Sequence, residues 1–133
     1  MRDNQTIINQ ACAFLAADPR ILLAVLHGSR AKGTARPDSD LDLGIAGEAP
    51  FTSDQLAEIS SSLEAHLDIP IDLVDLNRAQ GIILSKAITG LPLKDHVPLR
   101  TRLALQAMDF YENLLPAINT ARKAKAREFT RGN

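Results

Sequence analysis

Hydrophobic residues recur every three or four positions in two segments, and this spacing predicts amphipathic helices. The first helix is expected over residues 3–17, and its apolar stripe consists of Ile7, Ile8, Ala11, Cys12 and Leu15. Because the residue before a proline avoids the helical region, the Asp-Pro pair at 18–19 should end it. The second helix is expected over residues 53–67, with Thr52 or Ser53 suited to cap its N-terminus.

Three shorter segments have the pattern of β-strands. Residues 21–26 form a continuous apolar run, which is typical of a buried strand. Residues 39–45 alternate polar with apolar side chains, as in a strand with one face against a core. A third strand is predicted over residues 70–76, which read PIDLVDL, and a short extended piece over residues 91–94.

The remaining segments favour helices. One is predicted over residues 77–89 with Gly90 as its C-terminal cap, and a long one runs from Pro98 to about Phe129. Pro116 lies inside the second pattern, so a kink or break is expected near it. This order of elements predicts an α/β (α+β) fold, in which a small mixed β-sheet packs with helices.

Length and composition are those of one folded domain. The chain has 133 residues, of which 45% are hydrophobic and 23% are charged, so it can bury one core without disulfides or metals. We expect a single domain over residues 1–133, with a core at about 21–95 and a helical extension at about 97–130. The formal net charge of −1 argues against nucleic acid and anionic membranes as partners.

Cysteine usage and hydropathy indicate a cytoplasmic protein. The single cysteine, Cys12, cannot form an internal disulfide, which favours a reducing compartment. The longest apolar run, residues 21–26, is too short to span a bilayer, and no signal-peptide pattern begins the chain. We therefore expect a cytoplasmic location and no membrane partner.

An acid pair lies within the segment HGSRAKGTARPDSDLDLGIA, residues 27–46. Asp40 and Asp42 are two apart on a predicted strand, so both carboxylates should leave the same face while Leu41 and Leu43 face a core. Two adjacent carboxylates repel unless a cation lies between them. Mg²⁺, which prefers oxygen ligands, is the expected ion.

A Gly-Ser turn opens the same segment. Backbone N–H groups at Gly28 and Ser29, together with the serine hydroxyl, suit a phosphate oxygen. Arg30 and Lys32 are positioned to add positive charge toward the same phosphate, or to be solvated side chains. His27, just before the glycine, is interpreted as a packing residue at the end of a strand.

Gly28 and Ser29 are followed by ten residues and then by Asp40, Leu41 and Asp42. This G-S-x10-D-x-D pattern resembles the signature of the DNA polymerase β-like nucleotidyltransferase superfamily, and GSRAKGTARPDSDLDL resembles its minimal nucleotidyltransferase (MNT) branch. The resemblance extends from about residue 21 to residue 95. It implies a polymerase β-like nucleotidyltransferase core followed here by a long C-terminal helix.

The resemblance also implies roles for individual residues. It gives the third carboxylate of the family to Asp72, whereas Asp75, near the end of the same strand, faces the other way. The implied catalytic and metal-binding residues are Asp40, Asp42 and Asp72, which would hold two Mg²⁺ ions. The implied nucleotide-binding residues are Gly28 and Ser29, with ATP as substrate, and Arg30 and Lys32 are added to them on the basis of their charge.

The partner of MNT proteins is typically a HEPN-domain RNase toxin. By this resemblance the chain is an antitoxin that transfers AMP from ATP to a hydroxyl group, that of a tyrosine, on the toxin, in a hetero-oligomer with it. Leu105, Met108 and Leu115 would offer a docking surface.

Three alternatives remain open. An enzyme that modifies a small molecule such as an antibiotic would act without a protein partner. A non-catalytic antitoxin that acts by binding would tolerate Asp40→Ala and Asp42→Ala. An acid pair that only protects a strand edge from aggregation is the third.

Overall fold

The computed structural model describes residues 2–114 and 116–123. Its strands are β1 (Leu23–His27), β2 (Leu41–Ala46), β3 (Ile71–Asp75) and β4 (Leu91–Lys94). They form one sheet in the order β3-β2-β1-β4. β1 is antiparallel to β2 and β4, whereas β2 and β3 are parallel. The expected mixed sheet is therefore confirmed.

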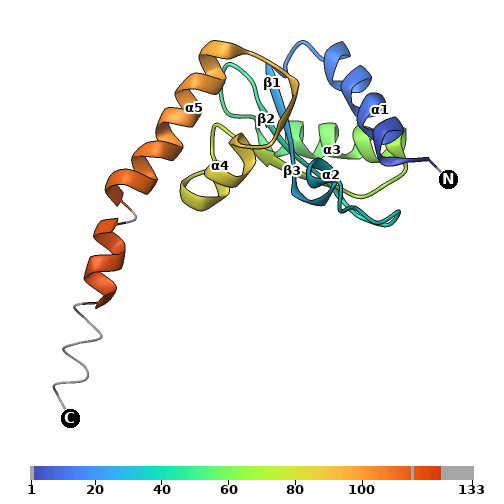
Figure 1. Ribbon diagram of the computed structural model, residues 1–133. Coiled ribbons are helices and arrows are strands. Elements are labelled where there is room, and N and C mark those ends of the chain that lie inside the picture. Colours follow the sequence, from blue (N-terminus) through green and yellow to red (C-terminus); the bar gives the residue numbers. More distant parts are fainter. Residues whose placement is uncertain (1, 115, 124–133) are drawn as a thin grey trace.

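Helices cover both faces of this sheet (Figure 1). The helices α1 (Asn4–Ala17) and α3 (Ser53–Leu67) share one hydrophobic core with the sheet, whereas α4 (Gly81–Ile88) and α5 (Val97–Asp109) share another. Alternate residues of β1 enter the two cores, which explains why its sequence is apolar throughout. Among the described residues, no helix combines the length and hydrophobicity that a membrane crossing requires.

Two helices begin where their sequences predicted. Asp3 caps α1, because its carboxylate accepts a hydrogen bond of 2.8 Å from the N–H of Thr6. Thr52 and Gln55 form a reciprocal capping box at the start of α3, in which each side chain accepts from the other residue's N–H. Both caps satisfy N–H groups that a helix cannot pair internally.

The helix α4 is shorter than the predicted helix over 77–89. It begins at Gly81, whose φ of +59° lies in the left-handed region, and Thr89 is its C-terminal cap. Gly90 is therefore not the cap that we expected. A Cβ on Gly90 would lie 2.1 Å from the carbonyl oxygen of Leu26, so the glycine instead lets the start of β4 approach β1 closely.

The C-terminal helical pattern is interrupted near Pro116, as predicted. After α5, residues Phe110–Leu114 form a π-helical turn, η1, and residues 116–123 are again helical. Proline lacks an N–H and its ring clashes with the preceding turn, so a regular helix cannot continue through this position. Figure 1 shows the segment extending away from the sheet. The predicted continuation to Phe129 lies outside the described residues.

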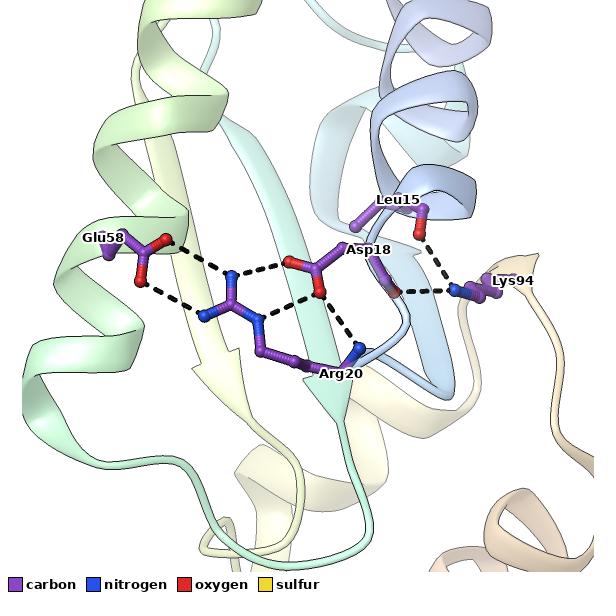
Figure 2. Close-up of polar contacts among 5 residues, drawn as sticks. All are labelled: Leu15, Asp18, Arg20, Glu58 and Lys94. Atoms are coloured by element: carbon purple, nitrogen blue, oxygen red, sulfur yellow. Dashed lines mark hydrogen bonds and ion pairs between the residues drawn. The ribbon is translucent and has the colours of Figure 1, made fainter.

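Charged side chains join the end of α1 to α3 and β4 (Figure 2). The Arg20 guanidinium donates to Asp18 at 2.8 Å and 3.0 Å and to Glu58 at 3.2 Å and 3.5 Å. The Lys94 ammonium donates to the carbonyl oxygens of Leu15 and Asp18, both at 3.0 Å. We call Asp18, Arg20, Glu58 and Lys94 the Arg20 cluster. Within this cluster, hydrogen bonds from Arg20 lower the pKa of the Asp18 carboxyl.

Candidate active site

Three predicted carboxylates meet at the start of β2 and β3. Asp42 lies directly opposite Asp72 in the parallel register, and Asp40 immediately precedes β2. Leu41 and Leu43 are both 0% exposed and belong to the core beneath α1 and α3. The predicted alternation of β2 is therefore confirmed, and it turns the acids toward the face that carries α4.

The environment of Asp42 disfavours an ionised carboxyl. Burial raises the pKa of the Asp42 carboxyl, and the charges of Asp72 and Asp40 raise it further. A hydrogen bond with the Asp72 carboxyl acts in the same direction, and only His27 opposes these effects. Since His27 pairs with Asp42 across β1 and β2, the opposing charge comes from the adjacent strand. An ionised Asp42 thus favours an added cation.

Gly28 brings the phosphate-binding candidates against this acid. It starts the short helix α2 (Gly28–Lys32) directly after β1, and its φ of +73° lies in the left-handed region that favours glycine. A Cβ on Gly28 would lie 2.1 Å from Oδ2 of Asp42. Only glycine therefore lets the carboxylate and the start of α2 come so close. Ser29 follows as the second residue of α2 and is half-buried.

The structure gives Arg30 a different role from the expected one. It is 3% exposed, and its guanidinium donates to the carbonyl oxygen of Ser39 at 2.7 Å and to Oδ1 of Asn4 at 3.1 Å. A longer bond of 3.4 Å reaches the carbonyl of Pro37. These contacts position the loop that leads into Asp40. The expected phosphate contact has no support in this arrangement, because the side chain is buried and donates to protein acceptors.

Asp75 faces away from Asp72, as expected, and forms hydrogen bonds within the fold. It is 6% exposed and accepts hydrogen bonds from the N–H groups of Phe51 at 2.8 Å and Asn77 at 3.0 Å. Its carboxylate also lies 3.7 Å from the guanidinium of Arg78. The spacing of three residues from Asp72 places it on the opposite face of the strand.

A cleft of about 630 Å³ opens beside the acids, which is within the usual range for ligand sites. One part of its lining comes from β1 and α2, namely His27, Gly28, Ala31 and Lys32. The other part comes from α4 and the start of β4, namely Lys86, Thr89, Gly90 and Leu91. The structure thus brings Lys32 to the site. Lys86 was not predicted to lie at the site, because an exposed lysine in a helix belongs to no sequence motif.

The donor atoms at this site fit a divalent cation. Asp42 lies opposite Asp72 in the parallel register, and the charges of Asp72 and Asp40 both act on the Asp42 carboxyl. No set of three or more His, Cys, Asp and Glu side chains within the described residues is arranged as a complete metal site. Mg²⁺ commonly takes only one or two protein carboxylates, and water and substrate phosphates complete its shell.

The sequence matches a known family and a characterised protein. The family described as "Polymerase beta, Nucleotidyltransferase" matches residues 9–95. A protein adenylyltransferase, MntA of Shewanella oneidensis, is 34% identical over 73 residues, which are 53% of this chain and 51% of that protein. The chain therefore aligns with about half the length of this curated relative.

Solved structures show the same fold. A crystal structure of a toxin–antitoxin with AMP-PNP contains a chain with a TM-score of 0.73 and 24% identity, which covers 92% of this chain and 98% of that one. A structure of tri-AMPylated Shewanella oneidensis HEPN toxin in complex with MNT antitoxin gives 0.70 and 22%, over 96% and 99%. The expected fold is confirmed by these likenesses.

Proposed function

The chain belongs to the polymerase beta nucleotidyltransferase family, and on that premise we propose that it transfers AMP from ATP to a hydroxyl group of a protein partner. The observation that carries this proposal is the contact between two elements of the site. Gly28, at the start of α2, lies against Asp42, which itself lies against Asp72. A phosphate held at α2 would therefore sit beside the acid pair.

Asp40, Asp42 and Asp72 are the residues proposed to hold magnesium, with two ions in the complete site. When bound, Mg²⁺ neutralises phosphate charge and aligns the attacking and leaving oxygens of an in-line displacement. The protein's own part is to keep the acids in place. Leu41 and Leu43 anchor β2 in the core on its other face, and the buried Arg30 holds the loop that precedes β2.

The proposed reaction forms one bond and breaks another at the α-phosphorus. The acceptor hydroxyl oxygen bonds to this phosphorus while the bond to the bridging oxygen of the β-phosphate breaks, and pyrophosphate leaves. Asp72 is exposed at the edge of the acid group, where it would receive the proton of the hydroxyl. Gly28, Ser29 and Lys32 would hold the β- and γ-phosphates during the transfer.

The proposed acceptor is a tyrosine of a HEPN toxin, with which the chain would form a hetero-oligomer as its antitoxin. Support comes from the matched adenylyltransferase and from the fold shared with toxin–antitoxin chains. On α5 and η1, Leu105, Met108 and Tyr111 are exposed by 59%, 52% and 43%, and this apolar surface is the proposed contact. Leu115, also expected there, lies outside the described residues. Because the reaction consumes ATP, the proposed location is the cytoplasm.

The direct test is transfer of label from α-phosphate-labelled ATP to a co-purified HEPN toxin in the presence of Mg²⁺. Wild type should label the toxin, whereas Asp42→Ala should not. Asp38→Ala is the matched control, because Asp38 is an exposed acid in the preceding loop. Neutralisation of the toxin without any label would instead indicate an antitoxin that acts by binding. Label on a small hydroxyl compound without the toxin would indicate a small-molecule enzyme.

A further inference from the structure

The cleft beside the acids has a lysine on each of two walls. Lys32 ends α2 on one wall, and Lys86 lies in the last turn of α4 on the other. Both side chains are exposed, and none of the ion pairs formed by the described residues involves either of them. Lys94, in contrast, donates to two carbonyl oxygens within the fold. The two cleft lysines are thus available to an anion.

The base of the cleft connects these lysines to the acids. Gly28 lines the cleft and lies against Asp42, as described above. His27 lines it too, and its Nε2 atom is buried without a hydrogen-bond partner in the described part of the chain. Buried polar atoms are nearly always paired in native structures. Among the described residues, Nε2 of His27 is the one buried side-chain polar atom that lacks a partner.

The charges of the site divide in a way that fits one kind of ligand. The carboxylates of β2 and β3 lie next to Gly28, where the α-phosphate would react, and one lysine lines each of two walls of the cleft. A triphosphate that begins at the acids and extends into the cleft would meet Lys32 and Lys86 with its β- and γ-phosphates. Ammonium groups bind phosphate through charge-assisted hydrogen bonds.

We propose that Lys86 binds the β- or γ-phosphate of the nucleotide, opposite Lys32, so that α2 and α4 together hold the leaving pyrophosphate. This inference rests on the proposed nucleotidyl transfer and adds to it a binding residue outside the Gly-Ser segment. It predicts which nucleotides depend on Lys86 for binding. Lys86 should matter for nucleotides that carry β- and γ-phosphates and should not matter for AMP.

Calorimetry with α,β-methylene-ATP, which cannot transfer AMP, tests this proposal in the presence of Mg²⁺. Lys86→Met should weaken binding by about fivefold to tenfold, as expected for loss of a partly solvated charged contact. Lys86→Arg should bind within about twofold of wild type. Lys123→Met is the matched control, because Lys123 is an exposed lysine on the distant C-terminal helical segment. AMP should bind wild type and Lys86→Met equally.

Two results would reject the role of Lys86, and a third would reject the proposed function. Equal binding of α,β-methylene-ATP by wild type and Lys86→Met would reject the role of Lys86 and leave the proposed transfer intact. An equal loss of AMP and α,β-methylene-ATP binding would also reject it, because the residue would then shape the cleft rather than bind the outer phosphates. Absence of any nucleotide binding by wild type would instead reject the proposed function itself.

Discussion

Two groups of charged residues in this small fold are built on opposite principles. In the Arg20 cluster, each carboxylate has a cationic partner, and Lys94 donates to carbonyl oxygens (Figure 2). In the acid group of Asp40, Asp42 and Asp72, like charges face one another, and His27 alone opposes them at Asp42. The pKa values of Asp18 and Asp42 are shifted in opposite directions. Hydrogen bonding with Arg20 lowers that of Asp18, whereas burial and neighbouring acids raise that of Asp42.

The contrast separates charges that pair with one another inside the fold from charges that repel one another. The Arg20 cluster is complete as it stands and ties the end of α1 to α3 and β4. The acid group would become more favourable if a cation joined it, and its like charges are held together by buried leucines on the other face of β2. A carboxyl with a raised pKa beside a cleft, such as that of Asp42, is typical of functional sites.

The largest expected difference between the two groups is in transfer activity. Asp42→Asn and Asp72→Asn should each lower the rate of AMP transfer by at least about a thousandfold, because metal-binding and charge-stabilising groups are lost. Asp18→Asn, in the Arg20 cluster, should leave the rate within about twofold. Initial rates of label transfer, measured well below the melting temperature, check this. A comparable loss in Asp18→Asn would remove the distinction.

The glycines at the two ends of α2, Gly28 and the C-cap Gly33, offer the next test. Gly28→Ala should abolish most transfer, because the new Cβ would meet Oδ2 of Asp42 at 2.1 Å. Gly33 is a matched control, since its φ is +75° but a Cβ there meets nothing within 4 Å. Gly33→Ala should lose only about 1 kcal/mol of stability, from backbone strain, and retain its activity. Retention of activity in Gly28→Ala would contradict the proposed contact between α2 and the acids.

Breaking the Arg20 cluster should have a smaller effect, on stability alone. Arg20 is 39% exposed and Glu58 is 61% exposed, so their ion pair is well solvated. Arg20→Ala is therefore expected to lower the free energy of unfolding only slightly, without changing the KM for ATP. Denaturant titration and initial rates measure the two quantities. A change in KM would show that the cluster reaches the site.

The smallest expected effect is on stability. Asp42→Asn and Asp18→Asn should change the free energy of unfolding at pH 7 in opposite directions. The raised pKa of Asp42 means that folding favours its protonated form, so its contribution to stability falls as pH rises through that pKa. Asp42→Asn should thus be more stable than wild type at pH 7, and the difference should vanish at acidic pH, where the Asp42 carboxyl is protonated in both the folded and the unfolded chain. Denaturant titrations in the presence of EDTA measure it.

Asp18→Asn should show the opposite behaviour. The lowered pKa of Asp18 means that its ionised form stabilises the native state above the ordinary carboxyl pKa. The variant should be less stable than wild type at pH 7, and the deficit should shrink as pH falls through the lowered pKa. If both variants shifted stability in the same direction at pH 7, the two groups would not differ as described.

The sequence predicted those features that depend on neighbours along the chain. The cap at Thr52 and the alternation around Asp42 follow from local geometry, and the structure contains both of them. The roles of Arg30 and Gly90 depend instead on distant segments. Arg30 finds its acceptors in α1 and the 37–39 loop, and Gly90 is required by the approach of β4 to β1. Their local sequence contains no signal of either contact.

Lys86 illustrates the same limit within the site. It reaches the cleft because α4 packs beside β1, and it lies 54 residues beyond Lys32 in the chain. No spacing rule in a single sequence connects two lysines that far apart. The G-S-x10-D-x-D segment is different, since a turn and the next strand bring its ends together within one supersecondary unit.

Thermal unfolding with and without ligand tests most directly whether the acid group is a cation site. In EDTA, Asp42→Asn should melt at a slightly higher temperature than wild type, because the like-charge repulsion is relieved. With Mg²⁺ and α,β-methylene-ATP, wild type should gain several degrees and melt above Asp42→Asn, so that the order reverses. If the variant gains as much as wild type from Mg²⁺ and the nucleotide, the acid group is not the cation site and the proposed mechanism is wrong.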